Sequence, residues 1–414
     1  MADWRECRLG DLGTVIGGGT PSREKTEYWD GDIPWITPGE LTGRRNKYVF
    51  ETQNCISELG LHASGAQLLP EGSLLVTSRA TIGSSALTAK PMATNQGFKN
   101  LVPNADVDPS FLFHLSRTLG REMKRRASGT TFLEISRREF ERIVVWIPTL
   151  EEQRRIAEIL DMTDKAIRAT ERIIAKLRLQ LCGVKHDLLM ARHDWEHGPA
   201  CRLLAVIDSG KSPVAEERSP GPAEWGVLKV SAVHPEGFRP DEAKVVSSSL
   251  VRKHDEVHDG DVLMTRANTT ALVGACCYVE DPPPRLQLSD KTLRLVPNSR
   301  VRPMFLALLL QSPNVRAQIE RDGTGTSGGM KNISQKEIRS LIVSWPDLQT
   351  QDQILSSLAV TTHQLRTELK SLKKLQGIRS GLADDLLLGS VKVAAGAGET
   401  AAAGARPCWP SRLL

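Results

Sequence analysis

The chain has 414 residues, which exceeds the roughly 100–200 residues of a typical domain and predicts at least two domains. Its most apolar run, residues 305–310, is far shorter than the ~20 residues of a membrane-spanning helix. No apolar segment flanked by Lys or Arg opens the chain. We therefore expect a soluble, cytoplasmic protein with no membrane partner.

The formal net charge is +5, yet basic and acidic side chains are nearly balanced in both halves. Residues 1–148 carry 18 Lys and Arg against 17 Asp and Glu, and residues 191–346 carry 20 against 19. Affinity for phosphates depends on cations gathered on one face, so net charge neither indicates nor excludes nucleic acid. Clusters such as Lys124, Arg125 and Arg126 would allow such a face, and they equally fit a solvated surface.

The seven cysteines are odd in number, scattered, and contain no C-x-x-C pair. This pattern argues against a disulfide framework and against a structural zinc site. We expect reduced thiols and no metal in this chain.

Residues 1–148 are predicted to form a mixed unit of the α+β class. Short β-branched runs at 74–77 and 143–147 lie between segments rich in Gly, Pro, Asn, Asp and Ser. A short helix is expected at 109–119, because a proline suited to the first helical turn opens it.

Residues 149–191 lack proline, and their apolar residues alternate steps of four and three, which predicts a long helix with a coiled-coil seam. At 1.5 Å per residue, about 40 residues would make a rod of about 60 Å. The seam residues expected to pair with another helix are Ile156, Leu160, Ile167, Ile174, Leu177, Leu181 and Leu188.

Residues 192–346 are predicted to form a second α+β unit, with a helix at 303–311 and a strand at 341–343. Residues 347–389 are predicted to form a second long helix, whose last turns Gly377 and Gly381 should loosen. Residues 390–414, rich in Ala and Gly, are expected to be a disordered tail. The second helix would pair through Ile354, Leu358, Leu365, Leu369 and Leu372.

The two halves are an internal repeat. Ile135 recurs as Ile333 and Pro148 as Pro346, a constant offset of 198 residues that continues into the helices. Upstream the offset drifts to 192 where 18–21 matches 210–213, and to 188 where 72–77 matches 260–265. Two helices of equal length can bury each other's seams, so we expect an antiparallel coiled coil with one globular unit at each end. One long helix packed on its own domain remains the alternative.

Candidate catalytic motifs are incomplete. Gly210-Lys211-Ser212 resembles the end of a phosphate-binding loop, but Ala205 replaces the required glycine. Asp281-Pro282-Pro283 lacks the aromatic residue that stacks a flipped base in amino-methyltransferases. Residues 240–244 place carboxylates and a lysine in one loop, whereas metal-dependent cleavage needs carboxylates converging from different strands.

Two histidine pairs have helical spacing, His193 with His197 and His254 with His258. Neither pair has a third ligand in a recognisable position, and the order of residues departs from the zincin motif. Surface or interdomain histidines are the better interpretation.

Polar residues in the loops have side chains that suit DNA. Arg and Lys can bind guanine, Asn and Gln can bind adenine, and Ser and Thr can hold phosphates, although each is also ordinary in loops. The candidate DNA-binding residues of the first unit are Thr20, Ser22, Arg23, Thr77, Ser78, Arg79, Asn95, Gln96, Lys99, Thr130 and Thr131. Those of the second unit are Lys211, Ser212, Lys229, Thr265, Arg266, Asn268, Lys291, Thr326 and Lys331.

Several of these motifs together resemble the specificity (S) subunit of type I restriction-modification enzymes. The resemblance covers about residues 1–390 and is weaker in the second copy, where Pro346 and Gln351 mark the helix start. It is carried by Leu9-Gly10-Asp11, Gly18-Gly19-Thr20-Pro21-Ser22, Tyr28-Trp29-Asp30-Gly31-Asp32-Ile33-Pro34-Trp35-Ile36, Asn95-Gln96-Gly97-Phe98-Lys99-Asn100 and Pro148-Thr149-Leu150-Glu151-Glu152-Gln153.

The resemblance implies two target-recognition domains, each reading one half of a split site in double-stranded DNA. The paired helices would space these domains and dock two methylation (M) subunits and restriction (R) subunits. The chain itself would be non-catalytic and hold no cofactor, with S-adenosylmethionine, ATP and Mg on the partner subunits. A coiled-coil scaffold with two ligand- or protein-binding domains, and a self-contained nuclease or methyltransferase, are the alternatives.

Overall fold

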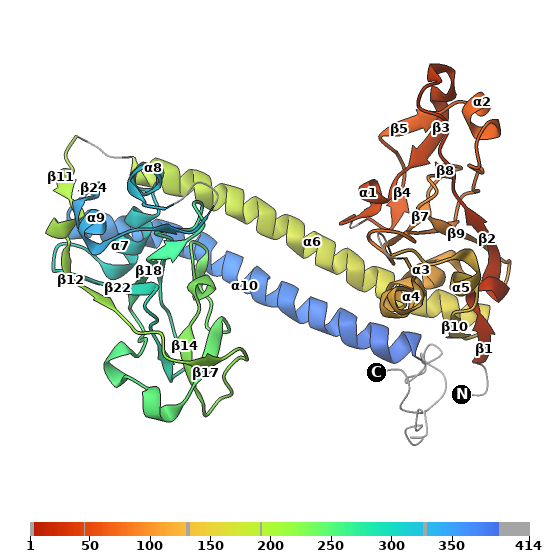
Figure 1. Ribbon diagram of the computed structural model, residues 1–414. Coiled ribbons are helices and arrows are strands. Elements are labelled where there is room, and N and C mark those ends of the chain that lie inside the picture. Colours follow the sequence, from red (N-terminus) through yellow and green to blue (C-terminus); the bar gives the residue numbers. More distant parts are fainter. Residues whose placement is uncertain (1–3, 45, 130–132, 191–192, 326–328, 389–414) are drawn as a thin grey trace. The chain divides into compact units, whose positions relative to one another are not determined.

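The structure is a computed structural model that describes residues 4–44, 46–129, 133–190, 193–325 and 329–388 (Figure 1). It has mixed helix and sheet content and divides into two compact units. Unit 1 comprises residues 1–172 and 369–414, and unit 2 comprises residues 173–368. Both long helices cross this division, so each unit contains part of each helix. None of the described helices is long and apolar enough to span a membrane.

Unit 1 contains a five-stranded sheet of order β2-β9-β6-β7-β4, a three-stranded sheet of order β5-β3-β8, and the pair β1-β10. Its strands are β1 Arg5–Arg8, β2 Gly13–Gly17, β3 Trp29–Ile36, β4 Tyr48–Val49, β5 Asn54–Ile56, β6 Leu74–Val76, β7 Ser85–Thr88, β8 Ala93–Thr94, β9 Lys99–Pro103 and β10 Val144–Ile147. Its short helices are α1 Pro38–Leu41, α2 Glu58–His62, α3 Pro109–Thr118, α4 Gly120–Arg126 and α5 Arg137–Glu141.

Unit 2 repeats the central topology, with one four-stranded sheet of order β12-β22-β18-β20 and another of order β13-β17-β14-β21. Its strands are β11 Glu196–Pro199, β12 Leu204–Ser209, β13 Ala215–Glu216, β14 Trp225–Leu228, β15 Val233–His234, β16 Gly237–Phe238, β17 Ala243–Val246, β18 Val262–Thr265, β19 Ala267–Asn268, β20 Cys276–Tyr278, β21 Leu286–Gln287, β22 Thr292–Pro297, β23 Lys331–Asn332 and β24 Ile342–Trp345. Its short helices are α7 Pro303–Leu310, α8 Pro313–Asp322 and α9 Gln335–Ser340.

The long helices are α6, Leu150–Leu189, and α10, Leu348–Leu387. α10 runs without a break through Gly377 and Gly381, and the expected weakening of its last turns stays a prediction. A Cβ at either glycine would meet nothing within 4 Å.

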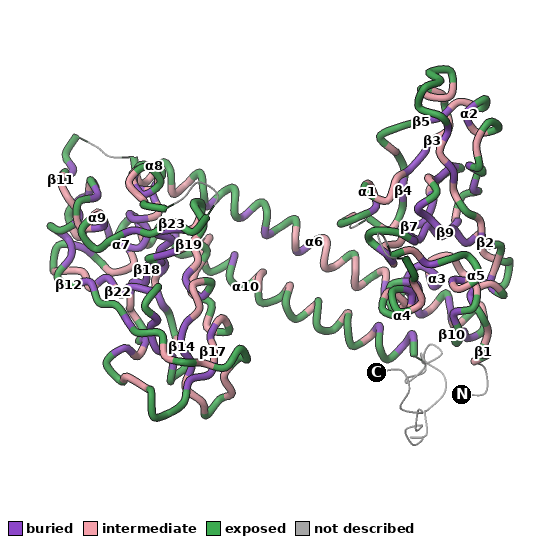
Figure 2. Tube along the Cα trace, in the orientation of Figure 1, coloured by how far each residue is buried: buried purple, intermediate pink, exposed green. Residues whose placement is uncertain are grey.

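The apolar core of unit 1 includes residues from the start of α6 and from the end of α10. Phe111 and Leu112 of α3 cluster with Ile156 and Leu160 of α6 and with Leu386 near the end of α10. The last turns of α10 therefore pack beside the first turns of α6, and burial follows one side of each helix (Figure 2).

Candidate nucleic-acid interface

In unit 1 the polar loops predicted from the sequence meet at one edge of the five-stranded sheet. Because β9 is antiparallel to both β2 and β6, its first residue Lys99 lies beside the last residue of β2, Gly17, and near the end of β6. Backbone hydrogen bonds fix the loops there: Ser78 N donates to Gly97 O at 2.8 Å, and Ile135 N donates to Ser78 O at 3.0 Å. Loop residues far apart in sequence thus form one surface.

Unit 2 builds the same edge from the matching strands. Thr265, at the end of β18, pairs with Thr292 at the start of β22. Arg266 N donates to Lys291 O at 2.8 Å, and Ile333 N donates to Arg266 O at 2.9 Å. The sequence repeat at 135 and 333 therefore marks the same structural position in both units.

A repeated glycine allows the close approach at this edge. A Cβ at Gly18 would lie 2.0 Å from Asn95 O, and a Cβ at Gly210 would lie 2.2 Å from Leu288 O. No larger residue fits either place without moving backbone. This explains why the glycine of the 18–21 motif recurs at 210.

A buried threonine closes the corresponding loop in each unit. Thr77 Oγ1 donates to Thr81 O and accepts from Ser84 N at 3.0 Å. In unit 2, Thr265 Oγ1 donates to Leu272 O at 2.7 Å and accepts from Ala275 N at 3.0 Å. The enclosed loops are residues 78–83 and 266–274, so the second loop is three residues longer. These three extra residues account for part of the change in the repeat offset, and they lie in the candidate interface.

Three of the candidate DNA-binding residues must be corrected. Thr77, Ser78 and Thr265 are buried, with at most 1% of their surface exposed, so their side chains do not face solvent. Lys99 stays a candidate, and its side chain is 12% exposed and lies 3.0 Å from Glu134. In sequence, a threonine that closes a loop looks the same as one that faces solvent.

The other described candidates are exposed or half-buried. Thr20 donates to Gln96, Asn95 Oδ1 accepts from Gly97 N at 2.6 Å, and Ser212 donates to Asp290. Exposed candidates are Ser22, Arg23, Arg79, Gln96, Lys211, Ser212, Arg266 and Lys291, and half-buried candidates are Thr20, Asn95, Lys229, Asn268 and Lys331. Thr130, Thr131 and Thr326 lie outside the described residues.

Unit 2 has a pocket of about 470 Å³ at this edge, lined by Ser212 and three lysines, Lys229, Lys244 and Lys291. Lys244 was missed by sequence reasoning. Lys244 pairs with Val227 of β14, Lys229 follows the end of β14, and both lysines line the pocket. Lys244 bonds to Glu217 and lowers the pKa of that carboxyl. The pocket therefore presents cations where the loops gather.

Among the described residues, no group of three His, Cys, Asp or Glu side chains could hold a metal ion. Lys211 and Ser212 follow β12 and precede the short strand β13, whereas a phosphate-binding loop leads into a helix.

Residues 1–179 match the family described as the Type I restriction modification DNA specificity domain. This match covers less than half of the chain. It agrees with the resemblance seen in the sequence motifs of residues 1–179.

Known relatives agree with this assignment. The MjaIX specificity subunit of Methanocaldococcus jannaschii is 35% identical over 184 residues, or 43% of each chain. The EcoEI specificity subunit of Escherichia coli is 32% identical over 188 residues, 44% of this chain and 32% of that one. The matched region thus spans less than half of either relative.

A solved structure extends the likeness to both units. The S subunit of a type I restriction-modification system from M. genitalium has a TM-score of 0.61 and covers 93% of this chain and 96% of its own. Its sequence identity is 15%, so this likeness concerns the fold.

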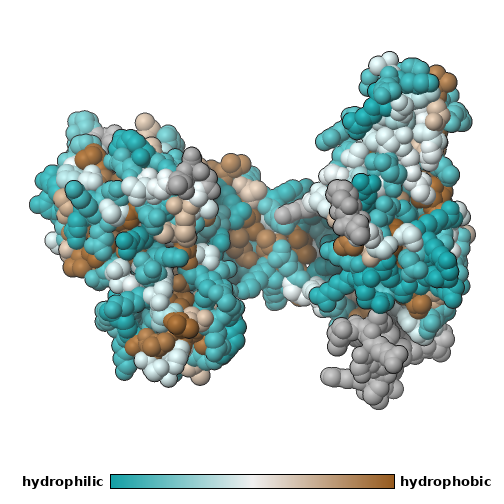
Figure 3. Space-filling view, viewed as in Figure 1, coloured by the Kyte–Doolittle hydropathy of each residue, from teal (hydrophilic) through white to brown (hydrophobic). Residues whose placement is uncertain are grey.

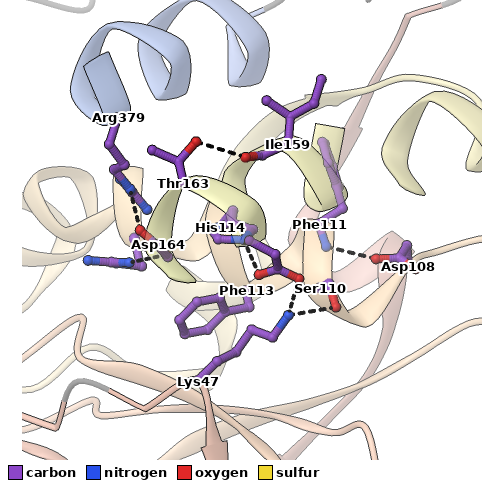
Figure 4. Close-up of polar contacts among 12 residues, drawn as sticks. Lys47, Asp108, Ser110, Phe111, Phe113, His114, Ile159, Thr163, Asp164 and Arg379 are labelled. Carbon is purple, nitrogen blue, oxygen red and sulfur yellow. Dashed lines mark hydrogen bonds and ion pairs between the residues drawn. The ribbon is translucent and has the colours of Figure 1, made fainter. Parts of the chain in front are cut away.

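The specificity domain of unit 1 is fastened to α6 by a buried polar network (Figure 4). The Nε2 of His114, a fully buried residue, lies 2.9 Å from Asp161 Oδ1. Lys47 reaches the same carboxylate and also Ser110 Oγ at 3.0 Å. Burial lowers the pKa of His114, and its Nδ1 has no partner, so the neutral ring donates from Nε2 to Asp161. Burial acts to raise the pKa of Asp161, but the bonds from His114 and Lys47 outweigh it and lower the pKa.

One turn further along α6, a second carboxylate connects three elements of unit 1. Asp164 lies 3.1 Å from Arg379 Nε on α10 and 3.4 Å from Arg117 on α3. The carboxylate and Arg379 are each about five-sixths buried. Asp164 therefore links the end of α10 to both α6 and the specificity domain.

In unit 2 the ion pairs between the globular part and the long helices are exposed, and they lie at other positions of the repeat. Arg302 forms two bonds with Asp352 on α10, at 2.9 and 2.8 Å, and both side chains are about half exposed. Arg366 pairs with Glu280, and Arg178 of α6 lies 2.8 Å from Glu236. Polar side chains cover most of the visible surface of both units (Figure 3).

The predicted pairing residues of the long helices all lie away from full exposure. Ile156, Leu160, Ile174, Leu177, Leu181, Ile354, Leu358 and Leu365 are buried, and Ile167, Leu188, Leu369 and Leu372 are half-buried.

Proposed function

We propose that the chain is the non-catalytic DNA-specificity subunit of a type I restriction-modification complex. Each unit reads one half of a two-part site in double-stranded DNA. The long helices pair antiparallel as a coiled coil, set the distance between the units, and dock two methylation subunits and the restriction subunits. S-adenosylmethionine, ATP and Mg belong to those partners, and the complex works in the cytoplasm.

The observation that carries this proposal is the loop edge that both units build. The supporting frame is the same, with Gly18 and Gly210 at the close approach and Thr77 and Thr265 closing the loops. The loop length and the exposed side chains differ, with Arg79 in one unit and Arg266 in the other. A shared frame with different surfaces is what two readers of different half-sites require.

A genome-wide map of adenine methylation in the host, with and without this chain, tests the proposal. We expect one bipartite motif to disappear when the chain is absent. Methylation of DNA by the purified chain alone would contradict the non-catalytic role.

Exchange of residues 1–148 for the first unit of another family member tests the independence of the two readers. One half-site should change while the other half-site and the gap stay the same. Insertion of about seven residues into α6 should lengthen the gap alone, because each residue adds 1.5 Å. A change in both half-sites after the exchange would contradict the two-reader proposal.

A further inference from the structure

A glutamine at the start of each long helix joins three chain segments. Gln153 of α6 donates from Nε2 to Pro148 O at 2.9 Å and to Asp106 O at 3.2 Å. Its Oε1 accepts from Asp108 N at 2.9 Å. The side chain is 1% exposed, so one amide fixes the end of β10, the first turn of α6 and the loop before α3.

Gln351 repeats every one of these bonds in unit 2. Its Nε2 donates to Pro346 O at 2.9 Å and to Arg300 O at 3.0 Å, and its Oε1 accepts from Arg302 N at 2.9 Å. This side chain is fully buried. The two glutamines are 198 residues apart, which is the constant offset of the repeat, and each makes the same set of bonds at the start of its long helix.

The loop that each glutamine holds also starts a core helix. Asp108 caps α3 by accepting from Phe111 N at 2.9 Å, and Phe111 packs in the core with Ile156 of α6. In unit 2, Arg302 occupies the corresponding position before α7. The amide therefore ties the direction of the long helix to the globular fold.

Neither Met nor Glu can make all three bonds of this amide. Met has the same length but no donor or acceptor of this strength, and Glu keeps the acceptor while losing both donors. Buried backbone groups without partners are costly, so such a joint would relax into other geometries.

We propose that Gln153 and Gln351 are positioning residues that set the angle between each recognition unit and its long helix, and so determine the gap between the half-sites. This inference rests on the proposed function. A tilt of about 5° over a helix of about 60 Å moves its far end by about 5 Å, which exceeds the 3.4 Å rise of one base pair. A loosened joint should therefore accept neighbouring gap lengths while reading the same bases.

The test uses the full chain assembled with its methylation partner. Duplexes carry the mapped half-sites with gaps from two base pairs shorter to two longer than the natural one. Wild type should methylate one gap. Gln153→Met and Gln351→Met should each raise the rate at gaps one base pair away at least tenfold relative to the natural gap, with both half-sites unchanged.

Ile36→Val is the matched control, since it removes one buried methylene from a separate core cluster of unit 1. It should leave the gap preference unchanged. Gln153→Glu, which retains the acceptor for Asp108 N, should broaden the gap less than Gln153→Met.

Folded Met variants that keep the wild-type gap preference would overturn the inference and leave the proposed function intact. If the Met and Glu variants all fail to fold, the glutamines serve stability alone and the inference is wrong. Wild-type complex with no bipartite preference would instead contradict the proposed function.

Discussion

In unit 1 the specificity domain holds α6 through a buried imidazole and a lysine that is 13% exposed, whereas unit 2 holds α10 through arginine and carboxylate pairs near half exposure. Both units share the glutamine joint, so the difference lies in what surrounds it. Asp161 of α6 corresponds to Ala359 in α10, which removes the central carboxylate of the network. The two copies therefore share the glutamine joint but differ in the polar contacts around it, which are buried in unit 1 and exposed in unit 2.

The largest expected effect is that of Asp161→Ala, which leaves Lys47 and His114 without their shared acceptor. Removing one partner of a buried pair costs about 3–5 kcal/mol, and we expect about 2–3 kcal/mol because 36% of the Asp161 side chain is exposed. Hydrogen exchange resolved by segment should show faster opening of unit 1 and unchanged exchange in unit 2. Equal loss in both units would contradict the local role of the network.

Replacement of the loop-closing threonines compares the shared frame. Thr77→Val and Thr265→Val keep the side-chain shape but remove the hydroxyl. Buried backbone groups then lose their hydrogen-bond partner, which should lower the free energy of unfolding by about 1–2 kcal/mol in each unit. Each variant should weaken methylation through its own half-site, measured with duplexes that carry changes in one half-site at a time. An effect on the opposite half-site would show that the loops are coupled.

Acid should weaken unit 1 through His114. Because burial lowers the pKa of the folded ring below its unfolded value, the unfolded chain binds more protons, and stability is lost as the pH falls below about 6.5. His114→Gln, which can still donate to Asp161, should flatten this dependence between pH 5 and 7. His234 of unit 2 shows the same direction but is 25% exposed, so its dependence should be shallower. An unchanged slope in His114→Gln would contradict this account.

The smallest effect should come from Asp352→Ala in unit 2. Exposed pairs contribute about 0–1 kcal/mol and are screened by salt. Exchange in unit 2 should change little at low ionic strength and not at all in 0.5 M salt. A loss of stability as large as that of Asp161→Ala would contradict the contrast between the buried contacts of unit 1 and the exposed ion pairs of unit 2.

Regular features of the fold could be predicted from sequence. The helices at 109 and 303 begin at their prolines, and the strands expected at 74, 143 and 341 begin within one residue of expectation, because local patterns determine them. The seam residues are buried or half-buried for the same reason, since helical spacing sets which side is apolar.

The polar sites were harder to predict. Lys47 and Asp161 are 114 residues apart, and no local pattern links them. Lys244 lies in the segment 240–244, which was considered only as an incomplete nuclease motif. The pairing of its strand with β14 brings it near Lys229. The buried threonines at 77 and 265 were misjudged because the loop that covers each one is visible only in the fold.

The packing of Ala383, Leu386 and Leu387 into the core of unit 1 has a consequence for synthesis. Ala383 follows Leu160, the last earlier member of that core, by 223 residues, so the ribosome makes it long after the rest of that core. The first unit must therefore wait for the end of α10 before its core is complete. A chain cut short within the second half would display an unfinished first unit, which proteases and chaperones can detect, so this fold reports on its own completeness.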